Sequence, residues 1–175
     1  GPVAIFPESQ LKPGMKAIAW TVFEGSDAEP VPVEIIGLWK NAWGPGQNII
    51  LGKMGGKAQR TNVAGGMSGS PVYIDGKLVG AVALRMSVFS PDAICGITPI
   101  ANMLEINDFD KSRPSDAKAP GSAPVRRAAA GSALEIPGEM LASVLAASGT
   151  RSEVASSPMM VPIETPLTLS GFTDS

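Results

Sequence analysis

The chain has 175 residues, of which 44% are hydrophobic, and this length suits one core of ordinary size with an appended segment. The net charge is only −2 and the 14 basic residues are scattered, which excludes the basic surface that nucleic-acid binding requires. The sequence has no histidine and a single cysteine, so it excludes an imidazole-based metal site, an internal disulfide and a histidine base within the chain itself. With 20 glycines, 16 prolines and 5% aromatic residues, the composition favours short strands joined by turns.

The first part of the chain predicts three strands and then a long loop. Residues 15–24, "MKAIAWTVFE", alternate in part and are rich in β-branched and aromatic side chains. Residues 31–39, "VPVEIIGLW", read as a second strand, with Pro32 at its start or on an edge. A third strand, "NIILGKM", follows the turn "WGPGQ", and the glycine-rich stretch "GGKAQRTNVAGGMSGS" predicts a loop.

The next part predicts a hairpin, one more strand and a helix. The strand "PVYI" and the strand "KLVGAVALRM" are separated by Asp75-Gly76, a strong two-residue turn. The strand "AICGI" follows, and Thr98 and Pro99 then predict the start of a short helix over "IANMLEI". We therefore expect residues 3–107 to form one unit of about six strands that ends in a helix.

Beyond this unit the composition changes. Residues 108–133 are rich in Pro, Ser, Ala and Gly, which predicts a flexible linker in which Arg126-Arg127 is solvated charge or an exposed cleavage site. Residues 134–175 predict a short helix in "PGEMLASVLAAS" and an extended strap over 158–172, and we expect this last part to be an incomplete unit. No apolar run is long enough to cross a bilayer.

Ser68, in the stretch "GGMSGS", is the candidate nucleophile. A serine hydroxyl attacks a carbonyl only with a base to take its proton and donors for the oxyanion that forms. Small neighbours let a substrate approach, and we expect the amides of Gly66 and Ser68 to converge on the oxyanion. Ser70 is the other hydroxyl, but Pro71 commits it to an extended conformation. The alternative is a glycine-rich loop with incidental serines.

The continuation "GMSGSPVYIDGKLVGAVAL" resembles the nucleophile segment of chymotrypsin-like serine peptidases. It is most similar to the SpoIVB sporulation peptidase family, and "LKPGM" and "GITPI" extend the resemblance over residues 11–106. The resemblance implies a mostly β fold with a chymotrypsin-like β-barrel, Ser68 as nucleophile, and the Gly66 and Ser68 amides as oxyanion donors. It also implies an exported bacterial serine endopeptidase, secreted or periplasmic, that acts on a protein or peptide without a cofactor. Met67 stands where an acidic residue is common, so activation by a freed N-terminus is not implied.

The resemblance also implies a histidine base, which this chain lacks. We therefore expect the base on a "GHP"-type turn downstream in a longer bacterial relative, and we expect the 175 residues alone to be inactive. Two alternatives stay open. The same barrel would serve as a catalytically inactive module that binds a peptide by strand addition, or as an assembly domain of an envelope protein.

Two lysines offer a different base. Lys53 and Lys57 precede Ser68, but a Ser-Lys pair needs a buried lysine and "GKMGGK" is typical of an exposed stretch. Asp92, after Ser-Pro, is interpreted as a turn residue, with the orientation of an external histidine as the alternative.

The remaining candidates favour structural roles. Cys95 has no basic neighbour in "DAICGITPI" and is expected to be a buried apolar side chain, with no special reactivity. Trp20, Trp39 and Trp43 are expected to pack in the core or at the barrel ends, with a ligand platform as the alternative.

Overall fold

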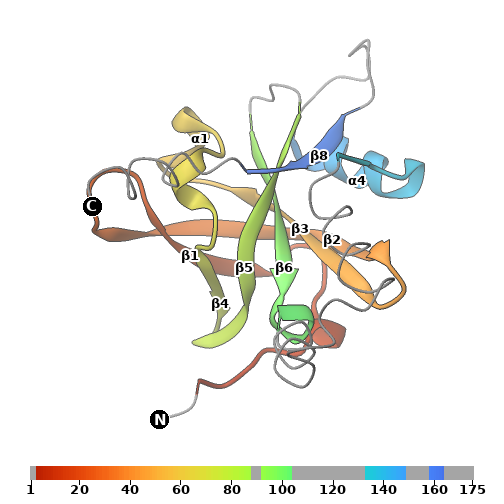
Figure 1. The fold of residues 1–175 in the computed structure, drawn as a ribbon, viewed down its shortest axis with the longest axis horizontal. Helices are drawn as coiled ribbons and strands as arrows, with labels where there is room; N and C mark the ends of the chain where they lie inside the picture. The colour runs from red at the N-terminus through yellow and green to blue at the C-terminus, as the bar shows by residue number, and fades with distance from the viewer. Residues whose placement is uncertain (1–2, 88–91, 104–132, 149–157, 164–175) are drawn as a thin grey trace, which may run out of the picture.

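The computed structural model describes residues 3–87, 92–103, 133–148 and 158–163, and its centre is a closed antiparallel β-barrel (Figure 1). This confirms the prediction of a mostly β fold built on a barrel. The six barrel strands are β1 (Lys16–Val22), β2 (Ala28–Gly44), β3 (Gln47–Met54), β4 (Pro71–Ile74), β5 (Lys77–Met86) and β6 (Ala93–Pro99). Short helical turns accompany them, among them η1 (Glu8–Gln10), α1 (Ala58–Thr61) and η2 (Gly65–Met67).

The strands follow one another around the barrel in the order β4-β1-β2-β3-β6-β5, and a further pairing between β4 and β5 closes it. The strands β1, β2 and β3 form a meander, after which the long loop of residues 55–70 returns the chain to pair β4 with β1. This arrangement is a Greek key. Closure leaves no free edge along most of the barrel, which explains how many short strands make a stable unit.

The turn between β4 and β5 forms for a local reason. Both Asp75 and Gly76 have positive φ, at 51° and 76°, as a tight two-residue hairpin of this twist requires. The sequence pair Asp-Gly therefore favours the turn that brings β4 against β5, next to the end of the loop that carries Ser68.

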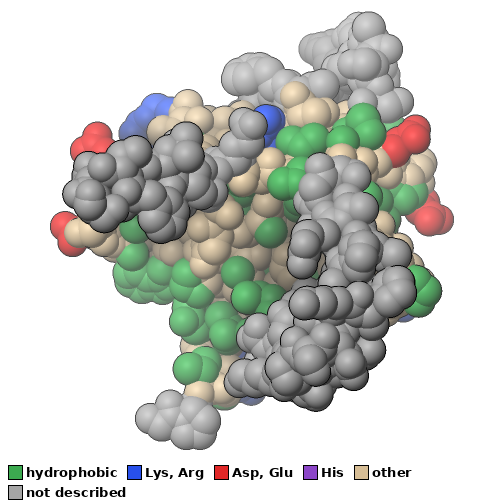
Figure 2. Space-filling view, in the orientation of Figure 1, with side chains coloured by type: hydrophobic (Ala, Val, Ile, Leu, Met, Phe, Trp, Pro, Cys, Tyr) green, Lys and Arg blue, Asp and Glu red, His purple; other side chains and the backbone are tan. Residues whose placement is uncertain are grey.

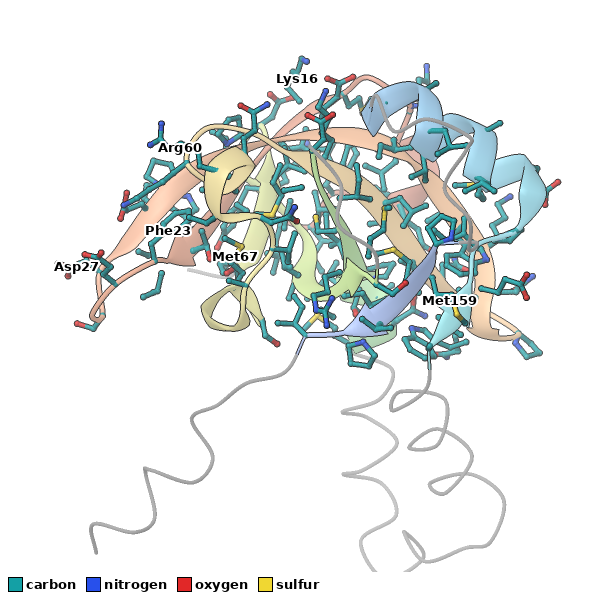
Figure 3. All side chains as sticks on the ribbon, turned by 90° about the horizontal axis from the view of Figure 1, so that it is seen from above. Lys16, Phe23, Asp27, Arg60, Met67 and Met159 are labelled. Carbon is teal, nitrogen blue, oxygen red and sulfur yellow. The ribbon has the colours of Figure 1, made fainter. Side chains whose placement is uncertain are left out.

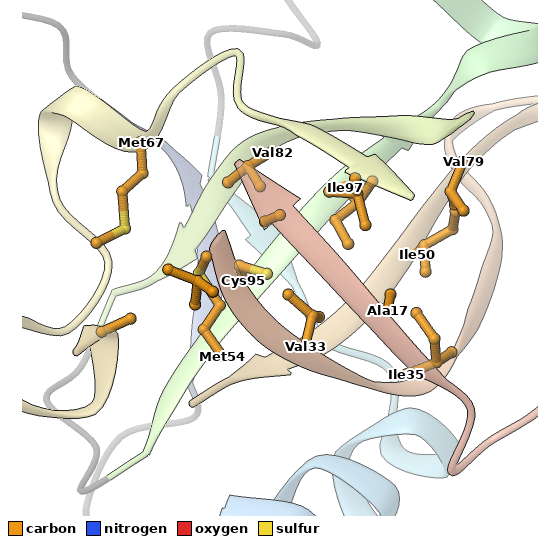
Figure 4. Close-up of a cluster of buried hydrophobic side chains, with 14 of the residues drawn as sticks. Ala17, Val33, Ile35, Ile50, Met54, Met67, Val79, Val82, Cys95 and Ile97 are labelled. Carbon is orange, nitrogen blue, oxygen red and sulfur yellow. The ribbon is translucent and has the colours of Figure 1, made fainter. Parts of the chain in front are cut away.

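The barrel interior is lined by small and β-branched side chains (Figure 4). On β1 the alternation points the small side chains of Ala17, Ala19 and Thr21 inward and those of Ile18 and Trp20 outward. A six-stranded barrel is narrow, so small inward residues suit it. The labelled residues of Figure 4 that fill it include Val33, Ile35, Ile50, Met54, Met67, Val79, Val82, Cys95 and Ile97.

A second core lies outside the barrel, between its strands and the helix α4 (Gly138–Ser148). Ile35 and Ile36 are consecutive on β2 and face opposite sides of the strand, so Ile35 joins the barrel interior and Ile36 joins the outer core. Trp39 and Val144 also belong to the outer core. The helix therefore covers apolar side chains that the barrel turns outward.

Two short strands extend the sheet beyond β5. The strand β8 (Met159–Pro162) pairs antiparallel with β5, and β7 (Leu134–Glu135) pairs with β8. The expected strap thus includes a strand at 159–162, and its remainder lies outside the described residues. The linker expected at 108–133, with Arg126-Arg127, also lies outside them apart from Ala133, while residues 100–103 are helical. No helix in the described ranges is long and apolar enough to span a membrane.

Candidate functional site at the serine turn

Residues 65–70, here called the serine turn, are held by a run of short-range hydrogen bonds. The Met67 amide donates to Ala64 O at 3.0 Å, and the Ser70 amide donates to Met67 O at 3.1 Å. Gly69 has a φ of +87°, which a residue with a side chain adopts only with strain. The glycine therefore allows the chain to reverse directly after Ser68.

Two further contacts fix the serine turn to the barrel. The Gly69 amide donates to Val82 O at 2.7 Å, and the Val82 amide donates to Ser70 O at 2.9 Å. The side chain of Met67 is only 1% exposed and lies in the barrel core (Figure 4). Ser68 therefore lies between the buried side chain of Met67 and the hydrogen-bonded amide of Gly69, and both contacts restrict its backbone.

The two hydroxyls of the turn differ in burial. Ser70 is 6% exposed, whereas Ser68 is half-buried, and no hydrogen bond to the Ser68 hydroxyl is found within the described residues. Ser68 is therefore the hydroxyl that an incoming group reaches more readily. Its role as a nucleophile stays a prediction.

The predicted oxyanion donors are arranged as follows. The Ser68 amide donates to Gly65 O at 3.2 Å, so it must leave this bond before it can donate to a substrate oxygen. Gly66 is exposed, and a Cβ placed on it would lie 3.0 Å from Val22 O. This close approach to β1 favours a glycine at position 66. The assignment of these two amides as oxyanion donors stays a prediction.

The lysines offered as an alternative base are engaged with carboxylates. Lys53 Nζ lies 3.8 Å from Asp92 Oδ1, and Lys57 Nζ lies 3.4 Å from Glu29 Oε2. Lys57 Nζ also lies 4.8 Å from the centre of the Phe23 ring. A base lysine must be neutral and desolvated, and Lys57 is half-exposed beside a carboxylate. These contacts give the Ser-Lys alternative no support.

The cysteine and the tryptophans were the other candidates, and the structure gives them no catalytic setting. Cys95 is fully buried, and burial raises the pKa of its thiol to about 12, so the nucleophilic thiolate is disfavoured. Trp39 and Trp43 pack in the outer core as expected. Trp20 does not: it is 43% exposed on β1, because the narrow barrel takes the small residues of that strand. Within the described ranges, no group of acidic or cysteine side chains is placed to hold a metal ion.

Trp20 borders a surface groove that sequence reasoning missed. The groove has a volume of about 820 Å³ and lies over β1 and β4, and its lining includes Ile18, Trp20, Pro71 and Tyr73. Figure 2 shows hydrophobic side chains gathered over this part of the molecule. The alternation in "AIAW" was a usable signal, because it places Ile18 and Trp20 on one face of the strand.

Two further features beside the serine turn were also missed. Thr21 is buried on β1, and its hydroxyl has no hydrogen-bond partner among the described residues. Ile163, which follows β8, donates its amide to Ala83 O at 3.1 Å. Ala83 comes directly after Val82, the β5 residue that binds the serine turn. No local sequence pattern indicates either contact.

Comparison with protein-family models, curated proteins and solved structures found no match to this chain.

Proposed function

We propose that this chain carries the nucleophile of a serine endopeptidase of the SpoIVB type, with a chymotrypsin-like β-barrel. The observation that carries the proposal is the position of Ser68: half-buried, in a tight turn fixed to β5 through Gly69 and to the core through Met67. A nucleophile gains from such a rigid setting, because its oxygen is held ready for attack. The six-stranded Greek-key barrel agrees with this class of fold.

The roles of the residues follow from the chemistry of acyl transfer. The Ser68 oxygen attacks the carbonyl carbon of an extended peptide, and the Gly66 and Ser68 amides donate to the oxyanion that forms. The amide of Ser68 exchanges Gly65 O for the substrate oxygen when the turn opens. The base is a histidine on a polypeptide outside these 175 residues, which contain none. We further propose that the protein acts outside the bacterial cytoplasm, where the resemblance places its family.

A second candidate function is peptide binding without catalysis. It is favoured by the pairing of β8 with β5, because in that pairing a strand from outside the barrel lies along this edge. Strand addition gives affinity through backbone hydrogen bonds and needs no nucleophile. In that case Ser68 is a turn residue only.

Hydrolysis by the full-length gene product separates the two functions. We expect it to cleave an unfolded protein substrate, and we expect Ser68→Ala to lower the rate by at least about a thousandfold, because removal of the nucleophile leaves only binding and oxyanion donors. Ser70→Ala is the matched control and should keep most of the activity. The 175-residue chain alone should be inactive.

Two results would overturn the peptidase proposal. One is full activity in Ser68→Ala, which would place the nucleophile elsewhere. The other is the absence of hydrolysis by a folded full-length product that contains histidine, which would favour the peptide-binding module.

A further inference from the structure

The edge of β5 that faces the serine turn is shared by two strands. β6 pairs with β5 from Gly80 to Arg85, so β4 and β8 must both lie on the opposite edge. β4 takes the first half of that edge and β8 takes the second, pairing with Leu84–Met86. The serine turn lies between them, because its Gly69 bonds Val82.

β8 points at the serine turn along this edge. It runs antiparallel to β5, with Met160 opposite Met86 and Pro162 opposite Leu84, and Ile163 then bonds Ala83. Each step along β8 thus brings the chain one residue closer to Val82 and the serine turn. Figure 3 shows β8 leading from Met159 toward the loop that carries Met67.

The side chains of this segment enter both cores. Met160 is fully buried in the outer core, whereas Ile163 is buried in the barrel core cluster that also contains Met67. The alternate faces of an extended segment explain this division. The stretch "PMMVPI" carries no charge, so its contacts with β5 are backbone hydrogen bonds and apolar packing.

We propose that residues 159–163 are a built-in inhibitor, because they occupy the β5 edge over residues 83–87 to which an extended, uncharged, aliphatic peptide would otherwise add as a strand. The inhibitory part rests on the proposed function of Ser68. A peptide that replaces β8 and runs in the same direction places an aliphatic side chain where the side chain of Ile163 lies. The next peptide group of that peptide then reaches Ser68. While residues 159–163 are in place, that path is closed.

Amide hydrogen exchange in the unaltered chain tests whether β8 detaches. The Ile163 amide donates to Ala83 O, and the Val82 amide donates to Ser70 O in the serine turn. These two hydrogen bonds are therefore neighbours on one edge of β5. We expect the Ile163 amide to exchange at least about tenfold faster than the Val82 amide, because a four-residue strand opens without the barrel. Equal protection of the two amides would show that β8 opens only with the whole barrel, and would overturn the proposal.

Peptide binding tests the site itself. Val161 pairs with Arg85, and Val161→Pro removes an amide from that ladder, whereas Val161→Thr keeps it as the matched control. A labelled peptide of sequence "SPMMVPIE" should bind Val161→Pro at least about tenfold more tightly than Val161→Thr. It should also restore slow exchange to the Ser87 amide, which bonds Met159 O in the intact chain. A peptide with Asp in place of its Ile should bind at least about tenfold more weakly.

The outcomes separate this proposal from the proposed function. The binding measurements should be unchanged in the Ser68→Ala background, because they need no chemistry. Peptide binding in a protein that never hydrolyses a substrate would retain the strand-addition site and reject the peptidase. If Val161→Pro does not bind the peptide, the strand-addition site is rejected and the peptidase proposal is not. The same holds if Val161→Pro unfolds globally, which fast exchange of the Val82 amide would show. If Ser68 reacts with a fluorophosphonate probe, it should react at least about tenfold faster in the full-length Val161→Pro product than in the Val161→Thr product. Equal rates would reject the inhibitory role.

Discussion

The amides of Gly69 and Ile163 donate to the carbonyls of two consecutive β5 residues, Val82 at 2.7 Å and Ala83 at 3.1 Å. The ladder between β5 and β6 has a register shift between Val82 and Leu84, and such a bulge lets neighbouring residues face the same edge. The serine turn and the end of β8 therefore meet at one point of the barrel. The proposed nucleophile and the proposed inhibitory segment are positioned by the same irregularity in β5.

Replacement of Gly80 should disrupt this region most strongly. A Cβ at Gly80 would overlap the carbonyl oxygen of Thr98 on β6, so β5 and β6 would have to separate. We expect Gly80→Ala to lower the free energy of unfolding by about 3 kcal/mol, measured by urea denaturation. Gly138→Ala is the control, because nothing lies near its Cβ position at the start of α4, and it should not lower stability. Equal effects of the two variants would contradict the close approach of β5 and β6.

The buried hydroxyl of Thr21 should lower the free energy of unfolding. It has no partner among the described residues, and a buried polar group without a hydrogen bond is destabilising. We expect Thr21→Val to raise the free energy of unfolding by about 1 kcal/mol in the same denaturation assay. The exposed Thr61 donates its hydroxyl to Asn62 O at 3.0 Å, so Thr61→Val should give no gain. A loss of stability in Thr21→Val would show that the hydroxyl is satisfied.

Some of this architecture is predictable from local sequence. Asp75-Gly76 specifies its hairpin because both residues tolerate positive φ, and the alternation along "KAIAWTV" specifies a strand. The same alternation does not say which face is inside. The position of Trp20 on a strand predicts packing in the core or at a barrel end, but the narrow barrel takes Ala19 and Thr21 instead and leaves Trp20 exposed.

The surroundings of Ser68 were only partly predictable. The run of glycines indicated a tight turn, and Gly69 does adopt positive φ. The contact of Ile163 with Ala83 depends on strand pairing between segments distant in the chain, which no short pattern encodes. The hydrogen bond from the Ser68 amide to Gly65 O, by contrast, is a local contact within the serine turn.

Cys95 should make stability fall in alkaline solution. Burial raises the pKa of its thiol from 9.0 to about 12 in the folded protein. Below pH 9 the thiol is protonated in both states and stability does not depend on it. Above pH 9 the unfolded thiol loses its proton while the folded thiol keeps it, so the free energy of unfolding decreases as the pH rises toward about 12. Urea denaturation of the unaltered chain and Cys95→Ala between pH 8 and about 11 measures the difference. Parallel curves would contradict the burial of the thiol.

The conformation of Gly69 should matter for the reactivity of Ser68. Its φ is +87°, and nothing lies near its Cβ position, so Gly69→Ala introduces backbone strain without a clash. We expect a loss of about 1 kcal/mol in stability and slower reaction of Ser68 in the full-length product. Gly69→Asn should be milder, because asparagine tolerates positive φ better than alanine. Faster reaction of Ser68 in Gly69→Ala would show that the observed turn is not the reactive one.

The site of modification by a fluorophosphonate probe tests the role of Ser68 most directly. The probe reacts with a serine that a base has activated, and mass mapping of the labelled protein identifies the residue. We predict that the 175-residue chain is hardly labelled because it has no histidine, and that the full-length gene product carries the adduct on Ser68. Ser70→Ala should leave most of the labelling and Ser68→Ala should remove it. An adduct on another residue, or a folded full-length product with a histidine that stays unlabelled, would contradict the assignment of Ser68 as the nucleophile.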